Sequence, residues 1–285
     1  MKKIFAFFAA ALMSVSMFAL TPNDGDVWDD ATKTLTVNSN PGEEAYMAQT
    51  EILHVIVSDA VTSIGVSAFD GCTELISATI GNKVVSLEEY AFYNCASLNS
   101  VTIGSSVTSI GRYAFYGCTG LNFIEIPNSV ETIKQGAFYG CTGLTSLTIG
   151  NKVTTCEAYS FENCTGLTSV TSPQSVTEIG VYAFKGCSGL LSITCEAVNP
   201  PTLGSQVFKD VSKSIPLYVP RESIEAYKGA DQWNAFGDNI KAIGSATGID
   251  NVQGDGEQNI KALHNGQLYI LRNGKLFNAT GAEVK

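Results

Sequence analysis

Histidine and closely paired cysteines are almost missing from this sequence. Only two of its 285 residues are His, and none of its eight Cys has another Cys three positions away. Zinc sites usually combine several such ligands at short spacings, so zinc binding has little support. The acidic stretch of Asp24, Asp26, Asp29 and Asp30 could contact calcium, but it lacks the spacing of a calcium loop, and a solvated turn is the interpretation that we favour. The HExxH, GxSxG and P-loop motifs do not occur either. We therefore expect no catalytic residue, no metal ion and no cofactor, and an enzyme is the function class that the sequence favours least.

Basic residues are also scarce. There are 17 Lys and Arg against 27 Asp and Glu, which leaves a formal net charge of -10. A surface that binds nucleic acid needs a basic face, so nucleic acid is excluded as a partner. Charged residues of both signs make up only 15% of the chain, whereas hydrophobic residues make up 45%. A chain of this composition folds around an apolar core rather than remaining disordered.

An apolar run stands at the start of the chain, over residues 4–20, behind Lys2 and Lys3. A basic start, an apolar stretch and a small residue near Ala19 are typical of a secretory signal peptide, which we assign to residues 1–19. A single membrane anchor is the alternative, since the run is near the lower length limit for crossing a bilayer. We expect the peptide to be removed, which leaves a mature protein outside the cytoplasm without a stable transmembrane span.

The middle of the chain repeats every 23 residues without insertion or deletion. Equivalent residues in neighbouring repeats are 23 positions apart, and we call each set of equivalent residues a column. A fixed period of this length is the signature of a solenoid in which each coil contacts only its neighbours. The columns are Phe69, Phe92, Phe115, Phe138, Phe161 and Phe184; Cys72, Cys95, Cys118, Cys141, Cys164 and Cys187; and Leu75, Leu98, Leu121, Leu144, Leu167 and Leu190.

Each coil reads roughly VTSIGxxAFxGCTxLxSVTIG. Its last segment places apolar residues two apart, as in Val101 and Ile103, which is the alternation of a short strand. Coils that run in one direction pair such strands in parallel. The Ala-Phe-x-x-Cys segment is too short for a regular helix and indicates a turn or a 3-10 piece. We therefore predict a mainly β repeat solenoid with one parallel sheet and short turns or 3-10 pieces opposite it.

The LxxLxL pattern inside each coil is that of leucine-rich repeats. The 23-residue version with Ala-Phe and Cys, as in AFYGCTGLTSLTIG at residues 137–150, resembles the BspA-like leucine-rich repeats of bacterial surface proteins. The resemblance covers about residues 52–243. It implies a right-handed coil, a location on the cell surface or in the medium, and adhesion to host proteins or to other cells. A polysaccharide-binding surface module is the alternative, and the partner would then be a glycan.

The same resemblance divides the body of the chain. Residues 22–60 are expected to form an N-terminal cap and a degenerate first coil, and residues 61–198 six repeats. Residues 199–243 resemble the closing segment of that family and would cap the last coil, whose apolar face and strand edge would otherwise meet water. Residues 244–259 are rich in Gly, Asp and Asn and are typical of a linker.

The C-terminal residues 260–285 have a character of their own. Asn-Gly pairs at residues 265–266 and 273–274 stand between apolar stretches and predict a small β meander. The stretch NGQLYILRNGKLFNATGAEVK at residues 265–285 resembles the C-terminal sorting segments of type IX secretion substrates. That resemblance implies that the secretion machinery is a partner of this tail.

An even number of Cys in a secreted protein normally suggests disulfides. Here six of the eight form one column, and Cys156 and Cys195 take the places of Ile in two others. We therefore expect eight buried free thiols that pack as small hydrophobic side chains. A bridge between stacked rungs is the alternative, because their separation falls in the range that a disulfide spans.

Two sets of side chains are candidates for the ligand-binding surface. In the third coil, Phe123 and Glu125 interrupt outward columns that otherwise hold Ser and Thr, which are expected to serve the sheet through cross-strand contacts. Isolated exposed apolar residues are also ordinary, so drift at an exposed site is the alternative for this pair. Tyrosines repeat in two other columns, where they suit contact with a protein or a glycan or else cover the phenylalanines. These columns are Tyr90, Tyr113, Tyr159 and Tyr182, and Tyr93, Tyr116 and Tyr139.

Overall fold

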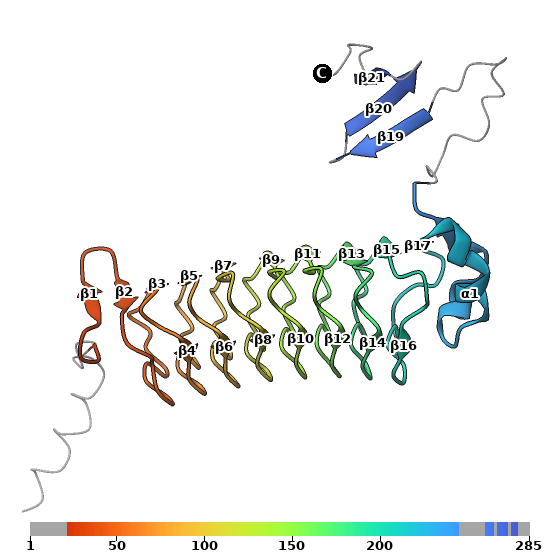
Figure 1. Ribbon diagram of the computed structural model, residues 1–285. Helices are drawn as coiled ribbons and strands as arrows, with labels where there is room; N and C mark the ends of the chain where they lie inside the picture. The colour runs from red at the N-terminus through yellow and green to blue at the C-terminus, as the bar shows by residue number, and fades with distance from the viewer. Residues whose placement is uncertain (1–21, 245–259, 265–266, 273–274, 279–285) are drawn as a thin grey trace, which may run out of the picture.

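The computed structural model describes residues 22–244, 260–264, 267–272 and 275–278. Residues 22–244 form a row of coils stacked along one axis, as Figure 1 shows. The fold is the predicted parallel β-solenoid, with few helices. The expected signal peptide at residues 1–19 lies outside the described residues, as does all but the first residue of the expected linker at residues 244–259.

The longer strand of each coil lies where the alternation of apolar residues predicts it. In β5, for example, Ala78 and Ile80 point into the core, and the neighbouring coil repeats this pattern in parallel register. The column is divided into two sheets, in the orders β1-β2-β3-β5-β7 and β9-β11-β13-β15-β17-β18, of which β1 (Val27–Asp29) and β2 (Thr34–Val37) precede the first coil. Its strands are β3 (His54–Val57), β5 (Ser77–Ile80), β7 (Ser100–Thr102), β9 (Phe123–Glu125), β11 (Ser146–Thr148), β13 (Ser169–Ser172), β15 (Ser192–Cys195), β17 (Leu217–Val219) and β18 (Ile240–Ala242).

A second column of parallel strands was not expected from the sequence, which predicted one sheet. Each member is only two residues long, so it shows no alternation by which it could have been recognised. The inward residue of each pair is buried, as Ile110 and Ile133 are. The seven strands are β4 (Ser63–Ile64), β6 (Ser86–Leu87), β8 (Ser109–Ile110), β10 (Thr132–Ile133), β12 (Thr155–Cys156), β14 (Glu178–Ile179) and β16 (Thr202–Leu203).

The phenylalanines stack in a continuous ladder along the axis. Phe92, Phe115 and Phe138 are fully buried, with 5.3 Å between successive ring centroids and nearly parallel planes. At the two ends Tyr46 and Phe208 continue the stack. Equivalent side chains therefore lie directly over one another, which is the physical basis of the 23-residue period.

The cysteines form a second internal ladder, and all eight are free and buried, as expected. Each of the six columnar thiols donates to the carbonyl oxygen 26 residues earlier, as Cys95 Sγ does to Phe69 O at 3.1 Å and Cys118 Sγ to Phe92 O at 3.2 Å. A thiol is small enough for the core and still satisfies a buried carbonyl that an aliphatic side chain would leave without this donor.

Both ends of the stack are closed by different structures. At the front, β1 (Val27–Asp29) pairs antiparallel with β2 (Thr34–Val37), which continues in parallel into β3. The Tyr46 hydroxyl donates to Asp26 and the ring covers Phe69. At the other end stand η1 (Arg221–Ser223), α1 (Ile224–Gly229) and η2 (Trp233–Asn239).

The C-terminal residues form a separate small antiparallel sheet. Its order is β19 (Ile260–His264), β20 (Gln267–Arg272) and β21 (Lys275–Asn278). Its three strands are those of the predicted meander, and the Asn-Gly pairs at residues 265–266 and 273–274 lie outside the described residues.

Candidate ligand-binding surface

The first tyrosine column occupies a turn position with left-handed backbone. Tyr90, Tyr113, Tyr159 and Tyr182 have φ between 52° and 62°, a region that non-glycine residues seldom adopt. Equivalent positions in other coils share this conformation whatever their residue type, for example Ser67 with φ of 52°. The turn itself therefore imposes the conformation, and each coil places an equivalent residue at the same corner.

Five tyrosines from three coils form one continuous aromatic cluster. In the second column Tyr93 stacks on Tyr116 and Tyr116 on Tyr139, with centroid separations of 4.6 and 4.9 Å. Tyr90 and Tyr113 stack at 5.6 Å and meet the second column edge to face. We call this cluster the tyrosine surface; its members are Tyr90, Tyr93, Tyr113, Tyr116 and Tyr139.

Two of the predicted tyrosines do not join this cluster. Tyr159 and Tyr182 form a tilted pair of their own, with centroids 5.6 Å apart. The first column is interrupted by Gly136, where a Cβ atom would lie 2.2 Å from Cε1 of Tyr113. Glycine at this position thus leaves room for the ring of Tyr113 to lean toward the next coil.

Stacking decides which parts of the rings meet solvent. All five rings are half-buried. Inside each stack the flat faces lie against neighbouring rings, so the edges and hydroxyl groups are the parts left for a ligand. The hydroxyl oxygen of Tyr113 accepts from Gln135 Nε2 at 2.9 Å, and that of Tyr139 from Asn163 Nδ2 at 3.2 Å. Burial, followed by the neighbouring tyrosines, raises the pKa of Tyr116, so its hydroxyl remains protonated at neutral pH.

Phe123 and Glu125 lie on β9 and not at the turn. Phe123 is paired with Ser146 and Glu125 with Thr148, so the two interrupted columns are real columns in space. The Phe123 side chain is 45% exposed. Among the described residues it makes no ring contact with the tyrosine surface, so the two candidates are separate places on the solenoid.

Comparison with known protein families identifies the family of this solenoid. A family model described as the BspA type leucine-rich repeat region matches in six copies, over residues 40–165 and 108–228. The chain belongs to the BspA-type leucine-rich repeat family. No curated protein matches this BspA-type chain.

Two solved structures are similar to this BspA-type solenoid. One is a leucine-rich repeat protein of T. pallidum, with 23% identity and a TM-score of 0.50 over 60% of this chain and 91% of that one. The other is a leucine-rich cell surface protein of Faecalibacterium prausnitzii A2-165, with 27% identity and a TM-score of 0.50. That match covers 65% of this chain and 56% of the other, so the chain spans little more than half of that protein. The first of these likenesses shows the fold alone.

A polar frame around the tyrosines was missed by the sequence reasoning. Arg112 donates to Oε1 of Gln135 at 3.2 Å, and the Gln135 backbone N–H donates to Glu157 Oε2 at 2.9 Å. Glu162 and Lys185 continue the second tyrosine column of the BspA-type repeats and form an ion pair of 2.7 Å. Following that column beyond Tyr139 in steps of 23 would have found both residues.

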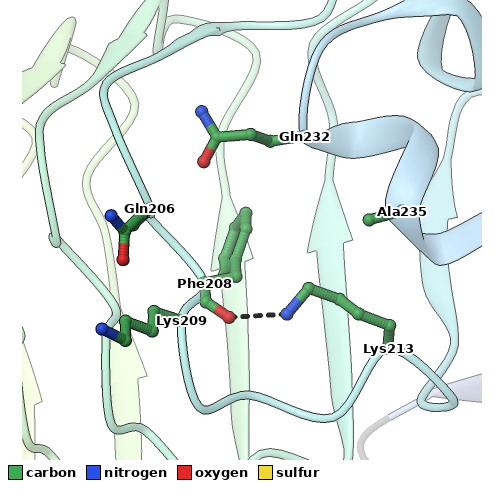
Figure 2. Close-up of a pocket in the computed structure, with 6 residues that line it drawn as sticks. All are labelled: Gln206, Phe208, Lys209, Lys213, Gln232 and Ala235. Atoms are coloured by element: carbon green, nitrogen blue, oxygen red, sulfur yellow. Dashed lines mark hydrogen bonds between the residues drawn. The ribbon is translucent and has the colours of Figure 1, made fainter.

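A cavity lies in the C-terminal cap, between the last coil and η2 (Figure 2). Its volume is about 260 Å³, below the usual size of a ligand pocket. Lys213, whose pKa is lowered by burial, donates to the carbonyl oxygens of Phe208 and Val211 at 2.5 and 2.7 Å. Gln232 likewise binds backbone atoms of Gly204 and Val207. These polar groups hold the cap together.

Membrane-spanning and metal-binding features are both missing from the part of the chain that the structure describes. No helix there has the length and apolar character needed to cross a bilayer. No group of three or more His, Cys, Asp or Glu is arranged there to hold a metal ion.

Proposed function

We propose that the protein is exported and displayed at the bacterial surface, where its solenoid binds a protein on host or bacterial cells and so serves adhesion. Membership of the BspA-type family and the likeness to a leucine-rich cell surface protein of F. prausnitzii support the location. A regular stack of coils presents a broad surface that suits a macromolecular partner better than a small molecule, and the cavity in the cap, about 260 Å³, is below the usual size of a ligand pocket. We propose no enzymatic activity.

The tyrosine surface is the observation that carries this proposal. Tyrosine is enriched in binding hot spots because it combines a large apolar area with a hydroxyl and loses little conformational entropy. Here neighbouring rings already fix one another, as in the edge-to-face contact of Tyr90 with Tyr93 at 5.4 Å. Such a preorganised cluster is ready to bind without further ordering.

The test compares two matched substitutions in the immobilised full chain. Tyr116→Ser removes the central ring of the tyrosine surface, whereas Tyr218→Ser removes a partly exposed tyrosine of β17 outside it. Saturable binding to extracellular-matrix proteins or whole cells should be lost in the first variant and kept in the second, with circular dichroism showing that both are folded. Equal binding by both variants would remove the tyrosine surface from the proposal.

A glycan partner is the alternative outcome. Polysaccharide recognition commonly uses an open aromatic face, and most faces of the tyrosine surface are covered by stacking. A glycan array probed with the full chain separates the two. Binding to glycans and to no protein would establish a polysaccharide-binding module instead.

We also propose that residues 260–285 direct export through a type IX secretion machinery. The support is the sequence resemblance and the small sheet β19-β20-β21 formed by these residues. Deletion of residues 260–285 should leave the protein in the periplasm, measured by fractionation and immunoblotting. Export at an unchanged level would reject this role.

A further inference from the structure

The solenoid holds one cation of its own at the C-terminal side of the tyrosine surface. Lys185 Nζ lies 2.7 Å from Oε1 of Glu162 and 4.8 Å from the ring centroid of Tyr182. Glu162 is only 4% exposed, so the lysine neutralises a carboxylate that is nearly withdrawn from water. A carboxylate in one coil and a tyrosine in the next thus form a receptor for an ammonium group.

The same two positions recur at the other end of the tyrosine surface, without the lysine. Asp70 is equivalent to Glu162 and Tyr90 to Tyr182, because both pairs differ by 92 residues, or four periods of 23. The position of Lys185, 92 residues after Tyr93, is occupied there by the Tyr93 ring. The carboxylate and the aromatic rings are present, and among the described residues no Lys or Arg forms an ion pair with Asp70; the nearby Arg112 is paired with Glu89.

Asp70 is left without a counter-charge. The four ion pairs among the described residues do not include it, and the charge that raises its pKa is the carboxylate of Glu44. Burial and then Glu44 raise the pKa of Asp70, as expected for a carboxylate that lacks a cationic partner. A positive group arriving here would relieve the repulsion between the two acids.

The tyrosine surface also ends here, because among the described residues no ring of the preceding coil continues the stack beyond Tyr90 and Tyr93. One face of Tyr93 is covered by Tyr116 at 4.6 Å. The opposite side faces the preceding coil, where the equivalent position holds Asp70 and not a ring. A carboxylate is a poor neighbour for the negative face of an aromatic ring, whereas a cation between them is attracted by both.

We propose that this end of the tyrosine surface binds a lysine or arginine side chain of a protein partner, between Asp70 and the rings of Tyr90 and Tyr93. The inference rests on the proposed function and adds the chemistry of the contact. Lysine and arginine are the usual cationic groups of protein surfaces, while nucleic acids and acidic glycans would be repelled by the carboxylates. We call this place the cation end of the tyrosine surface.

The experiment uses the full chain and a defined probe. A fluorescein-labelled decapeptide of alternating Lys and Gly is titrated with the protein at 150 mM salt, and its anisotropy is followed; the same peptide with every lysine acetylated is the neutral probe. Saturable binding is expected for the charged peptide and none for the acetylated one. Equal binding of both peptides, or binding of neither, overturns the inference.

Two substitutions separate the cation end from general attraction to an acidic protein. Asp70→Asn should weaken binding of the charged peptide about twofold to fivefold, as expected for one solvent-accessible charge pair. Asp238→Asn removes the same charge from an exposed residue of η2 and should leave binding unchanged. An equal loss of affinity in the two variants would mean that the peptide responds only to the net charge of the protein, which overturns the inference.

A tyrosine variant provides a second measure. Tyr93→Phe keeps the aromatic face and should bind as the unaltered chain does, whereas Tyr93→Ser should bind more weakly. If the chain binds a host protein through Tyr116 while Asp70→Asn has no effect on either ligand, the proposed function stands and the cation end is rejected. If the lysine peptide binds as expected but the chain binds no cell and no protein, the cation end stands and the proposed role in adhesion is rejected.

Discussion

At the scale of single residues, each ring of the phenylalanine ladder lies between two others. Phe115 has Phe92 on one face and Phe138 on the other, each at 5.3 Å, and it is fully buried. Its loss therefore affects two interfaces between coils. In a solenoid no distant contacts compensate for such a loss, because each coil touches only its neighbours.

Phe115→Ala should lower the free energy of unfolding by about 3–5 kcal/mol, the usual cost of emptying a packed aromatic site. Phe123→Ala is the matched control, because that ring is 45% exposed on β9, and the change should stay within about 0.5 kcal/mol. Urea unfolding followed by circular dichroism measures both. Similar urea midpoints for the two variants would contradict the burial of the ladder.

The buried thiols give a second prediction. Burial raises the pKa of Cys141 to about 12 and that of Cys118 well above its usual range, so almost no thiolate is available to react near pH 8. Iodoacetamide at pH 8 should leave the native protein unmodified and add eight groups after unfolding in guanidinium, counted by mass spectrometry. Fewer than eight groups would indicate a disulfide.

At the scale of the elements, close approach between coils depends on residues without a Cβ atom. A Cβ added to Gly104 would lie 2.1 Å from the carbonyl oxygen of Gly81 in the preceding coil. This contact is with backbone, so it is relieved only by separating the coils. Gly42, in contrast, has nothing within 4 Å of an added Cβ.

Gly104→Ala should lower the free energy of unfolding by about 1–3 kcal/mol, through the separation of neighbouring coils that overpacking forces. Gly42→Ala adds the same methyl group in open space and should be neutral or slightly stabilising. Thermal melting of the two variants under one buffer condition measures the difference. Equal melting temperatures would show that neighbouring coils can separate to admit the methyl group without a loss of stability.

The repeat made most of this element pattern predictable. A constant spacing of 23 requires equivalent side chains to stack, so the ladder of Phe92, Phe115 and Phe138, the buried cysteines and the register of β9 with β11 could be inferred from the columns alone. The second strand column could not, because two-residue strands have no period to detect. The break in pairing between β7 and β9 falls at the strand where Phe123 and Glu125 interrupt the outward columns, but the interruption of a side-chain pattern does not by itself predict a break in backbone pairing.

The candidate site was predictable only in part. The columns identified the tyrosines, and their spacing leaves a gap at Gly136, but they did not show that Tyr159 and Tyr182 form a tilted pair apart from the other five. The columns show which residues are equivalent but not how each ring is oriented. The stacking that covers the ring faces could therefore not be predicted from the sequence. The difference matters, because edges and hydroxyls suit a protein contact better than the stacking of sugars.

At the scale of the whole molecule, the buried thiols make the stability of the fold depend on pH in the alkaline range. An unfolded chain ionises its cysteines near pH ~8.5, whereas in the folded state Cys72, Cys141, Cys156 and Cys187 keep their protons up to a pKa of about 12. Between these values the unfolded state binds fewer protons than the folded state. Rising pH therefore favours unfolding, and the stability present below about pH 8.5 is progressively lost.

The free energy of unfolding should fall by about 1.4 kcal/mol per pH unit for each such thiol above about pH 9. Urea unfolding at pH 7, 9, 10 and 11 measures this slope, and return to pH 7 should restore the signal. Cys141→Ala removes one titrating group, so its slope should be shallower by about that amount whatever its stability at pH 7. A slope that is the same in this variant, or stability that does not change between pH 7 and 11, would mean that the thiols are not held protonated by the fold.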